Sequence, residues 1–304
     1  MTKQGKIGSL ILKIFLRPLG CLPLGFHRAC GRCIGRFLGK TVAYRRDVVM
    51  INLSRSFPEK KYKELQEICN KFYERLVTIF TEAIWFGSSS NKRLDKSHIA
   101  ELCGTEPLNA FYRQGKSVFV LSSHMGNWEL IGGIKHYAYS SPLDCPENDV
   151  CVVYKKQSSA MMNEFLKDNR IAAVKDKEHF DGMVETRNVM RYAVKNRHIS
   201  KLYTFIGDQY PYTGAARVEI ESFLGQKTPS MIGAASLACR MALPLVYQNM
   251  LLKEDGNYQM NYTVIAEDAS KFTPEELMTK YYALLEEDLR KQPWNYLWSH
   301  KRWK

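Results

Sequence analysis

The sequence of 304 residues has no acidic residue before Asp47 and no long apolar run that is free of charge. It contains no Walker-type or G-x-G-x-x-G loop for a nucleotide, no G-x-S-x-G elbow for a serine hydrolase and no H-E-x-x-H pair for a zinc protease. These absences argue against a nucleotide-binding protein, a serine hydrolase and a zinc protease. Apolar residues make up 45% of the chain, which is too many for a disordered protein.

The charge of the chain is concentrated at its N-terminus. The formal net charge is +13, and the first 46 residues hold ten basic residues and no acid: Lys3, Lys6, Lys13, Arg17, Arg28, Arg32, Arg36, Lys40, Arg45 and Arg46. The rest has 34 basic against 31 acidic residues, a net of only +3. In a uniformly basic nucleic-acid-binding module the basic residues would be spread over the whole domain, whereas here they are concentrated at one end. We therefore expect no nucleic-acid partner.

The basic N-terminal segment is also apolar. Residues 7–26 are mostly apolar, but two cations interrupt them and Pro18 and Pro23 would bend a helix, so the segment is poorly suited to a single membrane pass. Its polar residues recur at helical spacing: Lys6, Ser9, Lys13 and Arg17. This pattern predicts a helix lying in a membrane interface with its cations toward anionic headgroups, although a first core helix is an alternative. We therefore divide the chain into a membrane-associated segment, 1–40, and an α/β domain, 41–304.

The eight cysteines do not indicate a disulfide framework or a metal centre. Cys30 and Cys33 have C-x-x-C spacing, but zinc ribbons bring two such pairs together and no second pair exists. We expect no metal and no cofactor.

Strand-like and helix-like segments alternate along the main domain. Short apolar or alternating runs predict strands at 117–122, 149–155, 201–206, 217–223, 243–252 and 258–266. Helical patterns cover 47–57, 60–86, 161–169, 183–197, 231–241 and, after the capping sequence Thr273-Pro274-Glu275-Glu276, about 274–290. This alternation predicts a mixed, largely parallel sheet flanked by helices on both faces.

The stretch Ser122-Ser123-His124-Met125-Gly126-Asn127-Trp128-Glu129 is the most informative one. It follows a predicted buried strand, so His124 would emerge at a carboxyl end, where α/β sheets bind ligands. A turn at Gly126 and Asn127 could fold Glu129 back so that it accepts the Nδ1 proton and leaves Nε2 as a base. A base without an enzyme nucleophile can deprotonate a substrate hydroxyl. The alternative is a hydrogen-bonded structural histidine.

Five sequence blocks, in order, resemble one family. His124 to Glu129 looks like the H-x4-D/E motif of the glycerolipid acyltransferase superfamily, and the surrounding chain is similar to its lipid A biosynthesis (lauroyl/myristoyl) branch. The other blocks are Ile51-Asn52-Leu53-Ser54-Arg55-Ser56-Phe57-Pro58, Val153-Tyr154-Lys155-Lys156 with Asn169-Arg170, Gly207-Asp208-Gln209 with Phe223-Leu224-Gly225, and the closing Tyr296-Leu297-Trp298-Ser299-His300-Lys301-Arg302.

The resemblance implies an O-acyltransferase in which His124, oriented by Glu129, activates a hydroxyl of a phosphorylated glycolipid, such as a lipid A precursor. The acyl donor would be an acyl carrier protein thioester. Arg170 is a candidate for stabilising the oxyanion or gripping a phosphate, or else a surface arginine. Asp208 and Gln209 could line the same cleft, with a structural role as the alternative for Asp208, and Asn127 is a further candidate for substrate binding.

Such an enzyme would work on an anionic membrane, at the cytoplasmic face of the inner membrane. Two alternatives remain at this stage. The acceptor could be a lysophospholipid or another membrane glycolipid, or the chain could be a non-catalytic protein that binds membranes or polyanions through its basic N-terminus.

Overall fold

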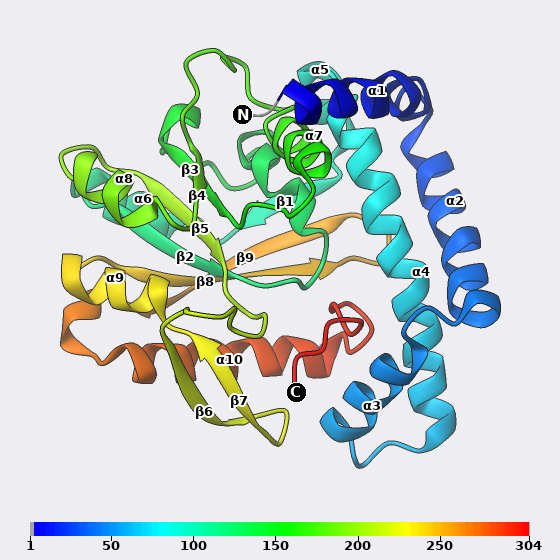
Figure 1. Cartoon of the computed structure of the whole chain (residues 1–304). Helices are drawn as coiled ribbons and strands as arrows, with labels where there is room; N and C mark the ends of the chain where they lie inside the picture. The colour runs from blue at the N-terminus through cyan, green and yellow to red at the C-terminus, as the bar shows by residue number, and fades with distance from the viewer. Residues whose placement is uncertain (1–2, 304) are drawn as a thin grey trace.

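The computed structural model describes residues 3–303 and has a mixed α/β fold built on a seven-stranded sheet (Figure 1). The strand order is β1-β9-β8-β2-β5-β3-β4. The strands are β1 (Ala100–Cys103), β2 (Val118–Ser122), β3 (Val150–Tyr154), β4 (Met183–Glu185), β5 (Leu202–Ile206), β8 (Leu245–Leu252) and β9 (Tyr258–Ala266). A separate antiparallel pair is formed by β6 (Arg217–Phe223) and β7 (Gln226–Met231).

The sheet is parallel except where β8 and β9 pair. Strand β2 lies between β5 and β8, and all five of its residues are buried. Phe119 and Leu121 contribute to one hydrophobic core, and Val118 and Val120 contribute to the other. Burial on both faces explains why this strand reads as a continuous apolar run and not as an alternating one.

Helices cover both faces of the sheet. They are α1 (Lys3–Gly20), α2 (Leu24–Phe37), α3 (Arg46–Ser56), α4 (Tyr62–Gly87), α5 (Asn91–Ser97), α6 (Glu106–Arg113), α7 (Ala160–Arg170), α8 (Val189–Lys195), α9 (Gly233–Met241) and α10 (Pro274–Lys291). The non-α helices are the π-helical turn Leu38–Val42 and the 3₁₀ helices η2 (Trp128–Tyr137), Glu147–Asp149 and Ala269–Lys271. Helices α9 and α10 contribute to the core that holds Phe119, while α6 and η2 contribute to the other.

Most of the predicted elements are confirmed, including the capping box that begins α10 at Thr273. The helix predicted over 183–197 is wrong in its first part. Met183 pairs with Val152 and begins the short edge strand β4, and α8 starts only at Val189. Pairing with β3 supplies backbone hydrogen bonds that a local pattern cannot reveal, so tertiary context overrides the helical spacing there.

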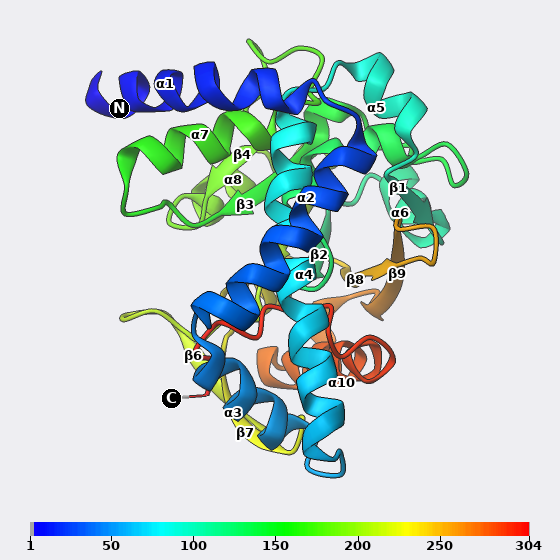
Figure 2. The ribbon, with the colours of Figure 1, turned by 90° about the vertical axis from the view of Figure 1, so that its right-hand side faces the viewer.

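The N-terminal segment forms two helices that pack on the domain. Helix α1 runs beside α7, and α2 runs beside α4 (Figure 2). Pro23 caps α2, and the two helices meet at a bend of 110°. Within the described residues, no single helix combines the length and hydropathy of a membrane crossing, whereas residues 5–20 and 24–42 meet both conditions together across that bend.

The structure leaves the apolar stripe of α1 free and turns part of its polar stripe toward the protein. Ser9, in the polar stripe, is only 2% exposed, and Lys13 forms an ion pair with Asp168 of α7. The apolar stripe faces outward, with Ile14 61% and Phe15 70% exposed. The amphipathic pattern is therefore confirmed. Lys6 and Arg17 of its polar stripe are exposed, whereas Ser9 is buried and Lys13 is paired with α7.

Glycines allow α2 to approach α4 closely. A Cβ added at Gly35 would lie 2.4 Å from the carbonyl oxygen of Tyr73 and 2.7 Å from the Cα of Glu74, both of which are backbone atoms. At Gly25, near the start of the same helix, an added Cβ would meet nothing within 4 Å. The contact therefore depends on the absence of a side chain at Gly35.

We expect Gly35→Ala to lower the free energy of unfolding by about 1–3 kcal/mol because the helices must separate to admit the methyl group. Gly25→Ala is the matched control, and it should leave stability unchanged or raise it slightly, since alanine favours a helix. Denaturant unfolding of both variants measures the difference. Equal stability of the two variants would contradict close packing at Gly35.

Candidate functional site

The site begins where two parallel strands end. Ser122 of β2 is in register with Ile206 of β5, so the residues that follow each strand emerge at the same edge of the sheet. His124 and Asp208 lie two residues beyond these positions. One Asp208 oxygen, Oδ1, is 2.8 Å from Nδ1 of His124 and 3.0 Å from its main-chain nitrogen. Asp208 therefore fixes both the backbone and the ring of the histidine.

This pairing replaces the predicted one, in which Glu129 would accept the Nδ1 proton. The chain does turn at Gly126, which has a φ of +73°, but the helix η2 that follows carries Glu129 toward the end of α7. There its carboxylate accepts two hydrogen bonds from Arg170, from Nε at 2.9 Å and from Nη2 at 2.7 Å. The carboxylate that orients the ring is that of Asp208, which follows β5 and lies 84 residues from His124 in the sequence.

Arg170 was expected to contact an oxyanion or a substrate phosphate, but in the structure its partner is Glu129. Its side chain is 15% exposed and that of Glu129 is 4% exposed, so the two charges are largely removed from water. Burial alone would lower the pKa of Arg170, but the attraction and hydrogen bonds of Glu129 outweigh burial and raise that pKa. The two groups form a charged bidentate pair that ties η2 to α7.

The charge of Asp208 is maintained in a buried position. Burial favours the protonated form, yet the charge and hydrogen bond of His124, with further hydrogen bonds including one from Tyr296, hold the pKa of Asp208 below its ordinary value of 3.8. An ionised carboxylate on Nδ1 favours the tautomer with the proton on that nitrogen. The lone pair is then on Nε2.

Two further side chains surround the imidazole. The amide nitrogen Nε2 of Gln209 is 3.0 Å from Nε2 of His124, where it can donate to the lone pair. The ring of Trp128 meets the imidazole edge-on, with 4.9 Å between the centroids. Gln209 therefore contacts the one ring atom that is free to act as a base.

Asn127 is buried and bonded within the protein, in contrast to the substrate contact expected for it. It is 0% exposed, its Oδ1 accepts from the main-chain nitrogen of Glu129, and its Nδ2 donates to Glu82 at 2.9 Å. Glu82 also accepts from Arg28 of α2 at 2.8 Å and from the hydroxyl of Tyr258 at 2.6 Å. Asn127 thus caps η2 and links it to a buried carboxylate.

Sequence reasoning missed Glu82. It lies at the C-terminal end of α4 in the run Thr81-Glu82-Ala83-Ile84-Trp85-Phe86, where it is an acid among mostly apolar neighbours. An isolated acid on the buried face of a helix was the available signal, because a carboxylate is rarely buried unless it is paired.

An apolar cavity of about 490 Å³ opens beside the same strand ends. Its wall includes Leu121 of β2 and Gly207, which directly precedes Asp208. The remaining wall comes mainly from the segment 186–190, the loop 212–216 and the start of α9. A mostly apolar space of this size suits a hydrocarbon chain. Among the described residues, no group of three or more His, Cys, Asp or Glu side chains is arranged to hold a metal ion.

We expect Asp208→Asn to lower the free energy of unfolding at neutral pH by about 1–3 kcal/mol because the buried charge is lost and an NH2 donor replaces one of its two acceptor oxygens. A carboxylate whose pKa falls on folding stabilises the protein when it is ionised, so the contribution is present above 3.8 and is lost as the pH falls through the folded-state pKa. Urea unfolding of the wild type and the variant, from neutral pH to below 3.8, measures the difference in their free energies of unfolding. A gap that does not change with pH would show that the charge of Asp208 does not stabilise the fold.

Comparison with known proteins identifies a family. A family model described as bacterial lipid A biosynthesis acyltransferase matches residues 4–304, which is nearly the whole chain. No curated protein matches it.

Proposed function

The chain belongs to the bacterial lipid A biosynthesis acyltransferases, and we propose that His124 is the general base with which it transfers a fatty acyl chain from an acyl carrier protein thioester to a hydroxyl of a phosphorylated glycolipid. The observation that supports this most directly is the contact between Nδ1 of His124 and Asp208, because it leaves Nε2 as the basic atom. Family membership makes the chain an acyltransferase, and the donor, the acceptor and the residue roles are our proposal.

In the proposed reaction, Nε2 of His124 removes the proton of the acceptor hydroxyl as its oxygen attacks the thioester carbonyl carbon. The C–S bond then breaks, and the imidazolium returns the proton to the leaving thiolate. Asp208 stabilises the imidazolium, which is the positive charge formed during the reaction. No covalent acyl-enzyme is needed.

Glu129 acts in this proposal through position, not through contact with the histidine. Its ion pair with Arg170 holds the start of η2, and the first residue of η2 is Trp128, whose ring packs on His124. Through Trp128, the pair therefore supports the orientation of the imidazole in addition to the hydrogen bond of Asp208. This assigns both residues of the H-x4-E motif to the same task.

Gln209 has a double role in the proposed cycle. Its amide donates to Nε2 of His124 before the acceptor arrives, so the acceptor hydroxyl must displace it. The displaced amide then lies beside the reacting carbonyl and can donate to the oxyanion. A single donor of this kind contributes about 3–4 kcal/mol to transition-state stabilisation in other enzymes.

The acyl chain of the donor would occupy the cavity of about 490 Å³ next to Gly207. Tyr212 lines this cavity, and the ammonium group of Lys155 lies 4.7 Å from the centre of its ring. Lys155 and Lys156 are exposed and would suit an acidic carrier protein docking next to the chain that it delivers. Because such a carrier is soluble, the proposed site works at the cytoplasmic face of the inner membrane.

The outward apolar face of α1 is the proposed membrane contact. Its exposed residues include Ile7, Ile14 and Phe15, and Phe26 and Phe37 extend the exposed apolar surface along α2. A helix that buries such a face in the bilayer interface keeps the domain next to its lipid acceptor. The 1–40 segment is then an anchor for the acyltransferase domain of 41–304, although the two pack on each other.

His124→Ala should reduce transfer by about 10²–10⁴-fold because the base is lost. The protein should stay folded and membrane-bound, since the main chain of residue 124 and Tyr296 still donate to Asp208. The measurement is acyl transfer from acyl carrier protein by the purified protein, combined with mass spectrometry of lipid A from a strain carrying only the variant. Loss of one acyl chain from lipid A supports the proposal. Normal lipid A with a change in another lipid identifies the lysophospholipid or other glycolipid alternative, and normal activity of the variant excludes His124 as the base.

Gly233→Leu should shift the preference toward shorter acyl chains. Gly233 lines the cavity, and a Cβ added there meets nothing within 4 Å, so the larger side chain fills cavity space without displacing the protein. Competition between carrier-bound acyl chains of different lengths measures the preference. Gly25→Leu is the control, since it adds the same atoms in open space on α2. An unchanged preference in Gly233→Leu would place the acyl chain elsewhere.

A further inference from the structure

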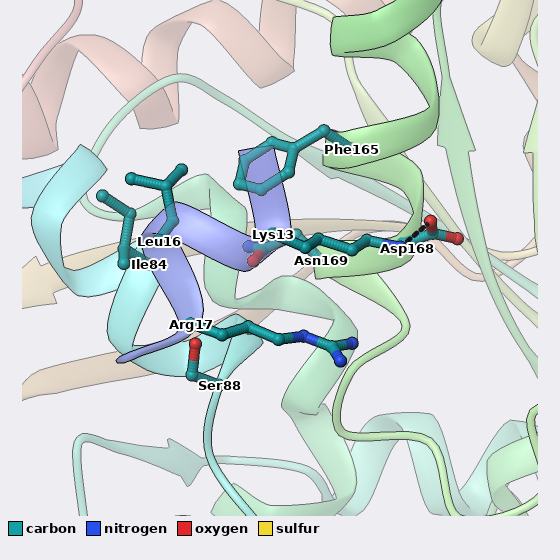
Figure 3. A pocket seen from close by; sticks show the side chains of 9 residues that line it. Lys13, Leu16, Arg17, Ile84, Ser88, Phe165, Asp168 and Asn169 are labelled. Atoms are coloured by element: carbon teal, nitrogen blue, oxygen red, sulfur yellow. Dashed lines mark hydrogen bonds and ion pairs between the residues drawn. The ribbon is translucent and has the colours of Figure 1, made fainter. Parts of the chain in front are cut away.

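A second large cavity lies between α1 and α7, apart from the site around His124. Its volume is about 500 Å³, and its wall includes Lys6, Ser9 and Lys13 of α1 and Lys167 of α7. Figure 3 shows a small neighbouring pocket, in which Lys13 reaches Asp168 and the side chain of Arg17 extends in the same direction. None of these residues belongs to the proposed catalytic machinery.

The cavity carries an excess of positive charge. Four lysines line it, the fourth being Lys177, against the two carboxylates of Glu164 and Asp168, which leaves a net of +2. Lys13 is the lysine that is neutralised, by Asp168. Across residues 3–303, Lys6, Lys167 and Lys177 form no ion pair with the protein. Three cations around one hollow can therefore act on an anion that enters it.

A buried hydroxyl supplies a second, independent observation. Ser9 is 2% exposed, it lines the cavity, and its Oγ has no hydrogen-bond partner among the described residues. A buried hydroxyl without a partner costs free energy that a ligand oxygen could recover. Its position on the same wall as Lys6 and Lys13 makes it a donor to the same anion.

The surroundings of the cavity are amphipathic. Leu10, Ile171 and Phe180 complete part of the wall, and the exposed apolar face of α1 begins at its rim with Ile7 and Leu10. A ligand that combines a phosphate with hydrocarbon chains would satisfy both surfaces. We propose that this cavity binds the phosphate of an anionic bilayer phospholipid, whose acyl chains lie along the apolar face of α1.

The test uses the full chain and vesicles of phosphatidylcholine with or without phosphatidylglycerol. Removing two unpaired cations in Lys167→Ala/Lys177→Ala should weaken binding to the phosphatidylglycerol vesicles about tenfold or more, with little change for pure phosphatidylcholine. The control is Lys92→Ala/Lys96→Ala on α5, which removes the same charge from exposed positions outside the cavity. Equal losses in the two double variants would mean diffuse attraction and would overturn the site.

Ser9→Ala separates a ligand contact from a structural role. The free protein should become no less stable, since an unpartnered buried hydroxyl is removed, while binding to phosphatidylglycerol should weaken several-fold. Unchanged binding by Ser9→Ala would remove the hydroxyl from the site. A loss of stability that parallels the loss of binding would indicate a packing role only.

A soluble short-chain phosphatidylglycerol and inorganic phosphate distinguish the source of the anion. The short-chain lipid should bind saturably, at one molecule per chain, and much more tightly than phosphate. If phosphate competes equally well, the hydrocarbon contributes nothing and the lipid assignment is wrong. These binding measurements need no turnover, so their result is independent of the reaction proposed for His124.

Discussion

The buried negative charge of Asp208 is the constraint on which the site depends. A carboxylate that is only 1% exposed is costly to ionise unless several donors surround it. Those donors are the ring and main chain of His124, with Tyr296 near the C-terminus. His124 and Asp208 meet only if β2 and β5 are adjacent, parallel and in register. The chemistry of the imidazole therefore depends on the order of the strands in the sheet.

One ion pair and one hydrogen bond hold the segment after β2 in place. Arg170 fixes Glu129 from α7, and Glu82 fixes Asn127 from α4. Each pair has a carboxylate that is almost fully buried and a cation or amide from a different helix. Contacts with Asp208, Arg170 and Glu82 therefore fix the turn that carries His124, so the turn is more rigid than an ordinary loop. Such pre-organisation is what proton transfer at a single nitrogen requires.

Local patterns predicted the strands, the main helices and the position of His124 at a strand end, because apolar runs and turn residues report the immediate neighbourhood. They predicted the wrong carboxylate for Nδ1. Glu129 is five residues from His124 and Asp208 is 84 residues away, and only the pairing of β2 with β5 brings the second one nearer. The local pattern also did not reveal which residues of the polar stripe of α1 contact the protein. A helical pattern defines two faces, but whether Lys13 points to solvent or to Asp168 depends on where α7 lies.

The hydrogen-bond partners of Glu82 come from parts of the chain that are synthesised at different times. Its partners Arg28, Asn127 and Tyr258 are separated from it by 54, 45 and 176 positions in sequence. During synthesis, α1 and α2 leave the ribosome long before β9 exists, and until then Glu82 lacks its tyrosine partner. The buried carboxylate of Glu82 is therefore fully paired only after β9 has been made. One carboxylate thus joins a helix made at the start of synthesis to a strand made near its end.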